Sequence, residues 1–266
     1  MRLIVKYCTI NLTLLFCESI FVKIKNLLNL LNIMKLLTFL GLTLLGLFFI
    51  VPNFKKEIHP KKIVMASSSK KVVTVYNTLN ANHFQLPNME SFSEALKGFY
   101  SFKDKGFFQK DFLTIIDFSL SSRVKRLWII DMVQNKIVFN SLVAHGKNSG
   151  EDYANQFSNK NESYKSSLGF YATGEVYQGK HGLSLKLDGL EKGINDNARE
   201  RAIVIHGADY VSDNFLKNHN RLGKSHGCPA VPMQLSKKII EIIKNKSCLF
   251  IYHSSKNNST SSKLLS

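Results

Sequence analysis

The sequence is poor in cysteine, which excludes a fold built on many disulfide bonds. Its 266 residues contain only four cysteines: Cys8, Cys17, Cys228 and Cys248. The first two lie in an apolar leader, so one bridge at most, between Cys228 and Cys248, remains for the rest of the chain. The local sequence around Cys228, described below, favours a free thiol. No Cys-x-x-Cys pair, the usual mark of a structural zinc site, is present.

Acidic residues are also scarce, because 19 Asp and Glu face 36 Lys and Arg, for a formal net charge of +17. A basic chain can meet nucleic acid, an anionic membrane surface or an acidic polymer, or simply carry a basic, soluble surface. The sequence has no helix-turn-helix, zinc-finger or RNP-like pattern, and it has no internal repeats. We therefore expect no nucleic-acid partner.

Apolar residues, in contrast, are plentiful. They make up 44% of the chain and include nineteen phenylalanines. This content supports a sizeable core and excludes disorder of the whole chain. The length suits one ordinary domain with an appendage, or two small domains.

The front of the chain has the features of a targeting segment. Leu36–Val51 is a run of sixteen residues without a charge, which suits a signal peptide or a slightly short membrane span. Basic residues precede it: Arg2, Lys6, Lys23, Lys25 and Lys35. Met34 is a second candidate start, and the nearest small-residue cleavage site, Val64-Met65-Ala66, lies well beyond the run. Residues 1–66 are thus interpreted as a targeting or membrane-anchor region and linker, which predicts an exported catalytic part.

A helical lead-in and a β-rich region follow. Residues 67–116 are interpreted as linker and helices, with a polar linker over 67–75. Helical spacing and apolar content predict helices at Ser91–Phe102, Lys110–Ile116 and Met233–Lys244. Short β-rich runs predict strands at Leu127–Met132, Ile137–Val143, Leu168–Thr173, Leu183–Leu187, Ala202–Ile205 and Leu249–Tyr252. Residues 254–266 read as a frayed polar tail. The overall prediction is a mainly β fold with a few helices.

One segment carries the chemistry. The strand predicted at Ala202–Ile205 ends at His206-Gly207, and a glycine-containing loop returns to Ser225-His226-Gly227-Cys228-Pro229. A histidine at a strand end and a cysteine beside a glycine are the parts of a thiol nucleophile and its base. A free thiol has a pKa of about 8.5, so it needs such a base at neutral pH. We expect the pair to titrate together, with the thiol pKa lowered and the imidazole pKa raised.

These residues resemble the catalytic signature of the L,D-transpeptidases. The pattern is His206, then eighteen residues, then Ser225-His226-Gly227-Cys228. Other pieces resemble the murein L,D-transpeptidase branch with a Cys-Pro-Ala motif: Val143-Ala144-His145-Gly146, Ser167-Leu168-Gly169-Phe170-Tyr171, Thr173-Gly174-Glu175, Gly179-Lys180-His181-Gly182 and His206-Gly207-Ala208-Asp209-Tyr210. The resemblance implies an L,D-transpeptidase-like β-sandwich over residues 117–253.

The resemblance also implies a role for each site residue. Cys228 would be the acylated nucleophile and His206 its proton acceptor, with the imidazole oriented by the carbonyl of Gly207. The remaining catalytic candidates shape the loop or line the oxyanion site: Ser225, His226 and Gly227. The substrate-binding candidates are Tyr171, His181 and Lys224. His145 and His181 sit in glycine turns, where they serve as loop anchors or as cleft residues. Ala230 stands where the better-known branch has an arginine.

The activity that the resemblance implies is acyl transfer on peptidoglycan stem peptides. Cys228 would cleave an L-D peptide bond through a thioester, and an amine or water would accept the acyl group. No cofactor is expected. Two alternatives come from other classes of protein: a non-catalytic cell-wall binding module, and a metal site with His206, His226 and Cys228 as ligands.

Overall fold

The computed structural model describes residues 23, 25–38 and 71–256 of the chain. The chain divides into two compact units, residues 1–61 and residues 62–266. In the first unit, residues 25–38 are helical. Within the described ranges no helix combines the length and apolarity that crossing a membrane requires. Most of the predicted targeting run, Leu36–Val51, lies outside these ranges.

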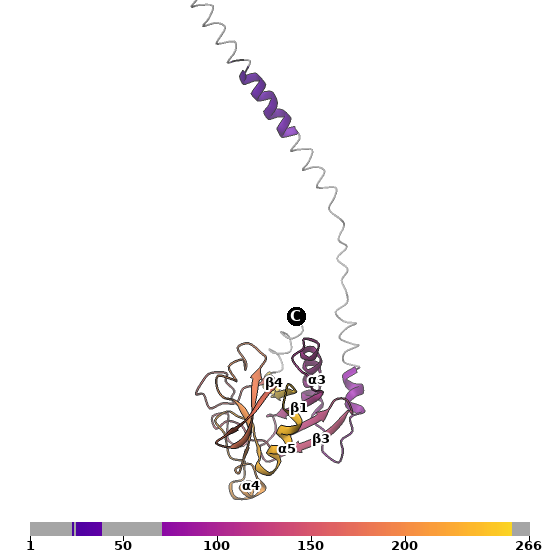
Figure 1. Ribbon diagram of the computed structural model, residues 1–266, viewed down its shortest axis with the longest axis vertical. Coiled ribbons are helices and arrows are strands. Elements are labelled where there is room, and N and C mark those ends of the chain that lie inside the picture. Colours follow the sequence, from indigo (N-terminus) through magenta and orange to yellow (C-terminus); the bar gives the residue numbers. More distant parts are fainter. Residues whose placement is uncertain (1–22, 24, 39–70, 257–266) are drawn as a thin grey trace, which may run out of the picture. The chain divides into compact units, whose positions relative to one another are not determined.

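The second unit is built around one mixed β-sheet of eight strands (Figure 1). The strand order is β3-β2-β1-β8-β4-β5-β6-β7. The strands are β1 (Phe112–Asp117), β2 (Leu127–Asp131), β3 (Lys136–Ser141), β4 (Gly169–Gly179), β5 (Gly182–Gly189), β6 (Val204–Ala208), β7 (Ala230–Pro232) and β8 (Cys248–Tyr252). Two parallel pairings, β1 with β8 and β6 with β7, interrupt an otherwise antiparallel sheet. The prediction of a mainly β domain is confirmed.

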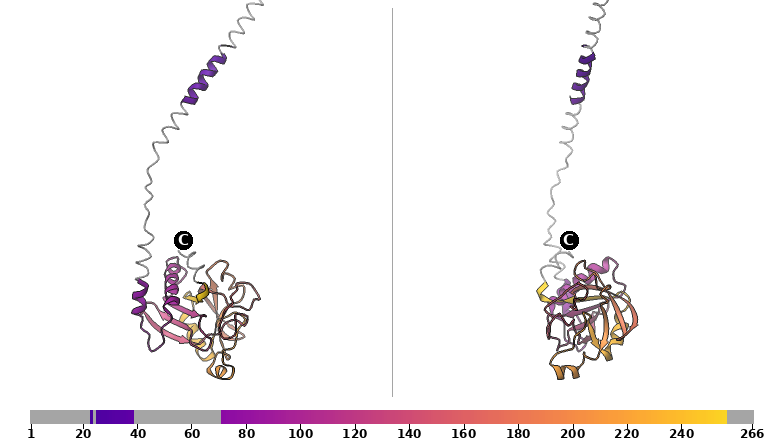
Figure 2. Two further views of the ribbon diagram at one scale, coloured as in Figure 1. Left: turned by 180° about the vertical axis from the view of Figure 1, so that it is seen from behind. Right: turned by 90° about the vertical axis from the view of Figure 1, so that its left-hand side faces the viewer.

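Each face of the sheet carries its own hydrophobic core, because side chains alternate along the strands. In β2, Trp128 and Ile130 belong to the core that includes helix α3 (Met89–Asp104). Leu127 and Ile129 point to the other core, which β5, β6, β7 and helix α5 (Met233–Ile243) share. The views from behind and from the side show the same helices beside the sheet (Figure 2). The site strands β6 and β7 are thus held by the second core.

Three local predictions need correction. Lys110–Ile116 is not a helix, because Phe112–Asp117 pairs with β2 on one side and β8 on the other. The side chains of this segment alternate between the two cores. This burial stabilises a strand more than the weak helical spacing of the segment favours a helix. Residues 71–77, which overlap the polar linker predicted at 67–75, are helical. Ser254–Lys256, at the start of the predicted tail, forms a short 3-10 helix, and residues 257–266 lie outside the described part.

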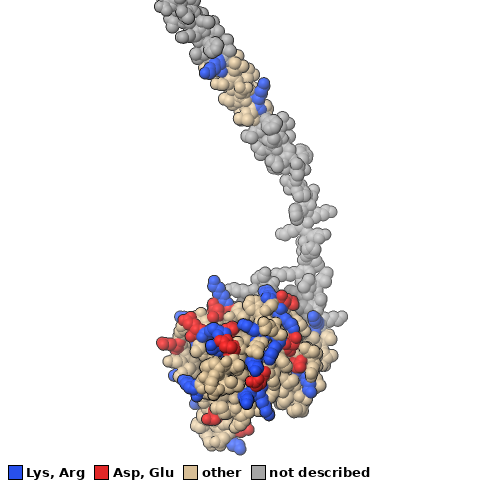
Figure 3. Space-filling view, viewed as in Figure 1, with Lys and Arg blue, Asp and Glu red and all other residues tan. Residues whose placement is uncertain are grey.

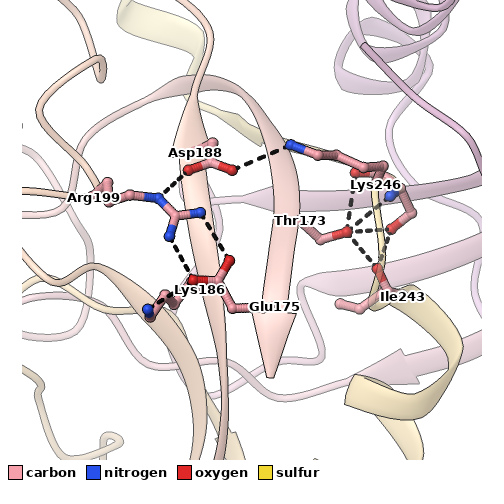
Figure 4. Close-up of polar contacts among 8 residues, drawn as sticks. Thr173, Glu175, Lys186, Asp188, Arg199, Ile243 and Lys246 are labelled. Carbon is pink, nitrogen blue, oxygen red and sulfur yellow. Dashed lines mark hydrogen bonds and ion pairs between the residues drawn. The ribbon is translucent and has the colours of Figure 1, made fainter. Parts of the chain in front are cut away.

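A polar network fastens the loop between β5 and β6 to the sheet (Figure 4). The Arg199 guanidinium donates to Asp188 at 2.5 Å and to Glu175 at 2.7 Å. Lys246 lies 3.5 Å from the other Asp188 oxygen. Nearby, the Thr173 hydroxyl donates to the Ile243 carbonyl at 2.6 Å. The Arg199 contacts tie the segment between β5 and β6 to both β4 and β5. The Thr173 and Lys246 contacts join these two strands to the end of α5 and to the turn that follows it.

Candidate active site

A cavity of about 650 Å³ lies beside β5 and β6. Six of the predicted site residues line it: His181, His206, Lys224, Ser225, His226 and Cys228. They come from the β4–β5 turn, from β6 and from the loop before β7. Segments far apart in the sequence are therefore brought to one place, as the motif spacing predicted.

The loop that carries Cys228 is shaped by Ser225 and Gly227. The Ser225 hydroxyl donates to the Cys228 carbonyl at 2.6 Å and accepts from the Gly227 N–H at 3.0 Å. Gly227 has φ +126°, and a Cβ there would lie 2.9 Å from the Lys165 carbonyl oxygen. Glycine fits because it tolerates this conformation and leaves room for the neighbouring backbone. Ser225 thus joins two backbone groups of this loop through one hydroxyl.

His206 lies within β6 rather than just after a strand, since β6 runs from Val204 to Ala208. It pairs with Ser184 of β5 and with Ala230 of β7. Its Nδ1 lies 2.9 Å from its neighbour's carbonyl oxygen, that of Gly207. A proton on Nδ1 completes that hydrogen bond and leaves Nε2 as the acceptor. The Gly207 carbonyl thus restricts the orientation of the His206 ring.

His181 stacks on His206, with ring centroids 4.5 Å apart and an angle of 23° between the rings. The β4–β5 turn therefore covers one face of the histidine in β6. This contact restricts the rotation of the His206 ring and gives His181 a packing role. Lys224 also has a protein partner, because its ammonium lies 2.5 Å from a Glu151 carboxylate oxygen.

Burial keeps the thiol and the imidazole neutral in the resting site. It raises the pKa of Cys228, although the Val204 N–H and the charge of Arg201 act to lower it. Burial lowers the pKa of His206, although its hydrogen bond to Gly207 acts to raise it. These directions are opposite to the expected thiolate–imidazolium pair, because removal from water penalises both charged forms. The proton must therefore move during the reaction.

Tyr171 lies in the core and does not line the cavity. It is 0% exposed, and its hydroxyl donates to the Ser167 carbonyl at 2.9 Å. Burial raises its pKa well above the usual range. The resemblance made Tyr171 a candidate for substrate binding, but the alternation of side chains along β4 turns this one inward. The structure therefore gives no support to a substrate contact by Tyr171.

His145 acts as a loop anchor. Its Nδ1 lies 2.8 Å from the fully buried Arg126 guanidinium, and its Nε2 lies 3.2 Å from the Gly150 carbonyl. Burial and the Arg126 charge lower its pKa to about 4, so the ring is neutral. Its carbonyl accepts from the Ser225 N–H at 3.0 Å. The buried Arg126–His145 pair thus supports the start of the cysteine loop.

Tyr164 and Arg201 are among the cavity residues that the sequence analysis did not assign to the site. The Tyr164 ring packs on His226 with centroids 4.7 Å apart, and Tyr164 has φ +52°. Arg201 also lines the cavity, and its hydrogen-bond partners lie 34 to 43 residues earlier in the chain. Such non-local contacts leave no local signal. Their only hint is that Arg201 immediately precedes the predicted strand of the motif.

The metal alternative finds no support among residues 23, 25–38 and 71–256. No group of three or more His, Cys, Asp or Glu side chains there is arranged to hold a metal ion. Cys228 and Cys248 are both free, so the disulfide considered from the sequence is not formed.

Comparison with known proteins decides the family. Residues 85–252, more than half of the chain, match the sequence profile of the L,D-transpeptidase catalytic domain. The chain belongs to this family. The matched region begins before α3 and ends at the last residue of β8, so it contains the whole sheet and the loop with Cys228. No curated protein matches the sequence.

Several solved structures are similar in part. The Pgp2 helical cell shape determining protein of Campylobacter jejuni is 16% identical, with a TM-score of 0.35 and coverage of 55% of this chain and 48% of that one. The Enterococcus faecium L,D-transpeptidase is 11% identical, with a TM-score of 0.32 and coverage of 54% of this chain and 50% of that one. An L,D-transpeptidase from Mycobacterium smegmatis is 8% identical, with a TM-score of 0.33 and coverage of 53% of this chain and 58% of that one. The chain thus spans about half of each.

Proposed function

We propose that this chain is a cysteine-dependent acyltransferase acting on peptidoglycan stem peptides. The observation that carries the proposal is the site itself. Cys228 and His206 line one cavity, and the imidazole is held by the Gly207 carbonyl with Nε2 left as the acceptor. A thiol and an oriented base on one cavity are the groups that nucleophilic acyl transfer requires. Membership of the L,D-transpeptidase family supports the peptidoglycan substrate.

The reaction then follows from the protonation states. Because burial keeps the thiol protonated and the imidazole neutral, Nε2 of His206 takes the thiol proton as Sγ attacks the carbonyl carbon of the L-D bond. The C–N bond breaks, the proton passes from His206 to the departing amine, and a thioester forms. An amine acceptor gives a cross-link, and water gives carboxypeptidation. In each case the acceptor's proton returns to the thiol through His206.

The backbone around Cys228 can hold the negative oxygen that forms in this step. The Gly227 N–H is already donated to Ser225, so it is a poor candidate in this resting geometry. The Cys228 N–H donates to no other residue of the described ranges and lies at the reacting atom. We assign the main hydrogen bond to the oxyanion to the Cys228 N–H. The resemblance had implied that Gly227 and Cys228 both line the oxyanion site.

The cavity contents argue against a non-catalytic binding module. Such a module needs neither a thiol nor an oriented base, and both are present here. Lining charges of both signs, among them Lys180, Arg201 and Glu200, suit a stem peptide that carries carboxylates and an amine. Basic and acidic side chains are also interspersed over the visible face of the second unit (Figure 3).

Incubation of the full chain with purified muropeptides tests the proposal. We expect loss of a terminal D-amino acid from the stem, with a cross-linked or a shortened product, read by mass spectrometry. Because a thiol and a base suffice for this chemistry, a chelator should leave the rate unchanged, while a thiol-alkylating reagent should abolish it. Chelator-sensitive turnover with stoichiometric zinc would instead support the metal alternative.

We propose that the catalytic unit works outside the cytoplasmic membrane, where peptidoglycan lies. The uncharged run Leu36–Val51 after a basic flank supports export, by a signal peptide or a membrane anchor. A reporter enzyme that is active only outside the cytoplasm, fused after Ser266, should therefore be active in a bacterial host. The same fusion with Leu40 and Leu45 replaced by arginine is the control and should be inactive. Activity of a cytoplasm-only reporter in the unaltered fusion would refute export.

A further inference from the structure

We propose that Arg201 is a positioning residue of this site: its guanidinium fixes the cavity wall at residues 158–167 against Gly227 and keeps an unpaired positive charge beside the Cys228 loop. This inference rests on the proposed function, since it assigns a second basic group to the same nucleophile. Arg201 lies at the end of the loop before β6 and lines the cavity.

The guanidinium is held by four hydrogen bonds to one segment. Its Nη1 donates to the Ser158 carbonyl at 2.8 Å and to the Ser167 hydroxyl at 3.2 Å. Its Nη2 donates to the Lys165 carbonyl at 2.6 Å and to the Ser163 hydroxyl at 3.3 Å. Only a planar fork can serve four acceptors spread over ten residues of chain in this way. Arg201 therefore acts as a clamp on the 158–167 wall.

The clamped wall is the surface on which the nucleophile loop packs. The Ser166 hydroxyl donates to the Gly227 carbonyl at 3.0 Å. A Cβ on Gly227 would lie 2.9 Å from the Lys165 carbonyl oxygen and 3.3 Å from Nη2 of Arg201. The guanidinium thus contacts the wall, and the wall contacts Gly227, the residue before Cys228. A shift of the wall would move the loop that sets the position of the thiol.

The charge of Arg201 is not neutralised by a carboxylate. All four of its acceptors are uncharged, and no ion pair within residues 71–256 includes it. It is half-buried, and its charge acts to lower the pKa of Cys228 against the effect of burial. The other cations on the cavity are Lys180, which acts in the same direction, and Lys224, which is paired with Glu151. The acidic lining residues are Glu162 and Glu200.

Two substitutions separate the clamp from the charge. Arg201→Met removes both, and Arg201→Lys keeps the charge but loses the fork. The readouts for the full chain are the pH profile of Cys228 alkylation by an uncharged probe, mapped by mass, and kcat/KM on muropeptides. We expect Arg201→Met to move the alkylation profile to higher pH, while Arg201→Lys stays close to the wild type. Both should lower kcat/KM by about 10²-fold, as misplacement of a nucleophile does.

Arg199→Met is the matched control, because Arg199 lies on the same loop but makes solvent-exposed contacts with Asp188 and Glu175, away from the cavity lining (Figure 4). Because Arg199 also ties this loop to β4 and β5, the variant shows what loosening the loop does by itself. We expect an unchanged alkylation profile and a smaller loss of kcat/KM than in Arg201→Met. An Arg201→Met profile identical to that of the wild type would overturn the proposal, as would full activity of Arg201→Lys. If Arg201→Met does not fold, the kcat/KM of Arg201→Lys decides. Alkylation needs no muropeptide. Absence of wild-type turnover would therefore refute the proposed function, while the alkylation profiles of the wild type and Arg201→Met would still decide this inference.

Discussion

Cys228→Ala is expected to reduce product formation from muropeptides to background, a loss of about 10⁴-fold or more. Without the thiol no thioester can form, and no other cysteine in residues 71–256 lines the cavity. The fold should survive, because the change removes one sulfur atom from a partly exposed site and leaves the Ser225 and Gly227 contacts to the backbone in place. The measurements are product mass and the thermal unfolding midpoint of the same preparation.

Cys248→Ala is the matched control for this variant. Cys248 begins β8, is 0% exposed and packs in the core shared with α3. Its loss should lower thermal stability by creating a small cavity, while activity per folded molecule stays at the wild-type value. Substantial turnover by Cys228→Ala, or loss of turnover in folded Cys248→Ala, would show that the nucleophile has been assigned wrongly.

His206→Ala is expected to lower kcat/KM by about 10²–10⁴-fold, the usual contribution of a general base. The pH dependence follows from the direction of its pKa. Burial lowers the pKa of His206, so the imidazole stays neutral, and able to accept a proton, below the pH at which an ordinary histidine becomes charged. The acid limb of the kcat/KM profile should therefore lie below pH 6.5 in the wild type and be absent in His206→Ala. Stopped assays across pH 4–9 would measure both.

His226→Ala serves as the comparison, since His226 lines the same cavity but packs on Tyr164. It should cost less activity and keep the acid limb. If His206→Ala retained near-normal rates while His226→Ala was inactive, the base would be the other histidine, although the cysteine chemistry would stand.

Much of the site could be predicted because its signals are local. Ser225, Gly227 and Cys228 are close in sequence, and the hydrogen bonds among them follow from one tight loop. His206 and Gly207 are neighbours, so the carbonyl that orients the ring could be named in advance. The mainly β fold was predicted from runs of β-branched and aromatic residues. The late helix was predicted from the helical spacing of its apolar residues, and its predicted end lies within one residue of the observed one.

Other features depend on contacts that no local pattern reveals. Phe112–Asp117 is a strand because β2 and β8 lie on either side of it, whereas its short sequence also fits a helix. Tyr171 is buried through the register of β4, which glycine-rich motifs do not fix. Arg201 meets a segment more than thirty residues earlier in the chain. In each case tertiary packing outweighs local propensity.

The pKa directions show the same limit. From sequence, a histidine near a cysteine suggests an ion pair, because opposite charges attract. In the structure the protein shields both groups from much of the surrounding water, and this raises the pKa of Cys228 and lowers that of His206. Burial depends on the whole fold around the cavity, so the neutral pair could not be read from the spacing of the motif.

The central claim is that Cys228 carries the acyl group, and trapping that group tests it most directly. The wild-type chain is mixed with a stem tetrapeptide, quenched in acid within the first turnover, digested and mapped by mass spectrometry. We expect the peptide that contains Cys228 to gain the mass of the donor without its terminal D-amino acid, and to lose it again after hydroxylamine treatment. Product formation with no adduct on Cys228, or with the adduct on another residue, would contradict the mechanism.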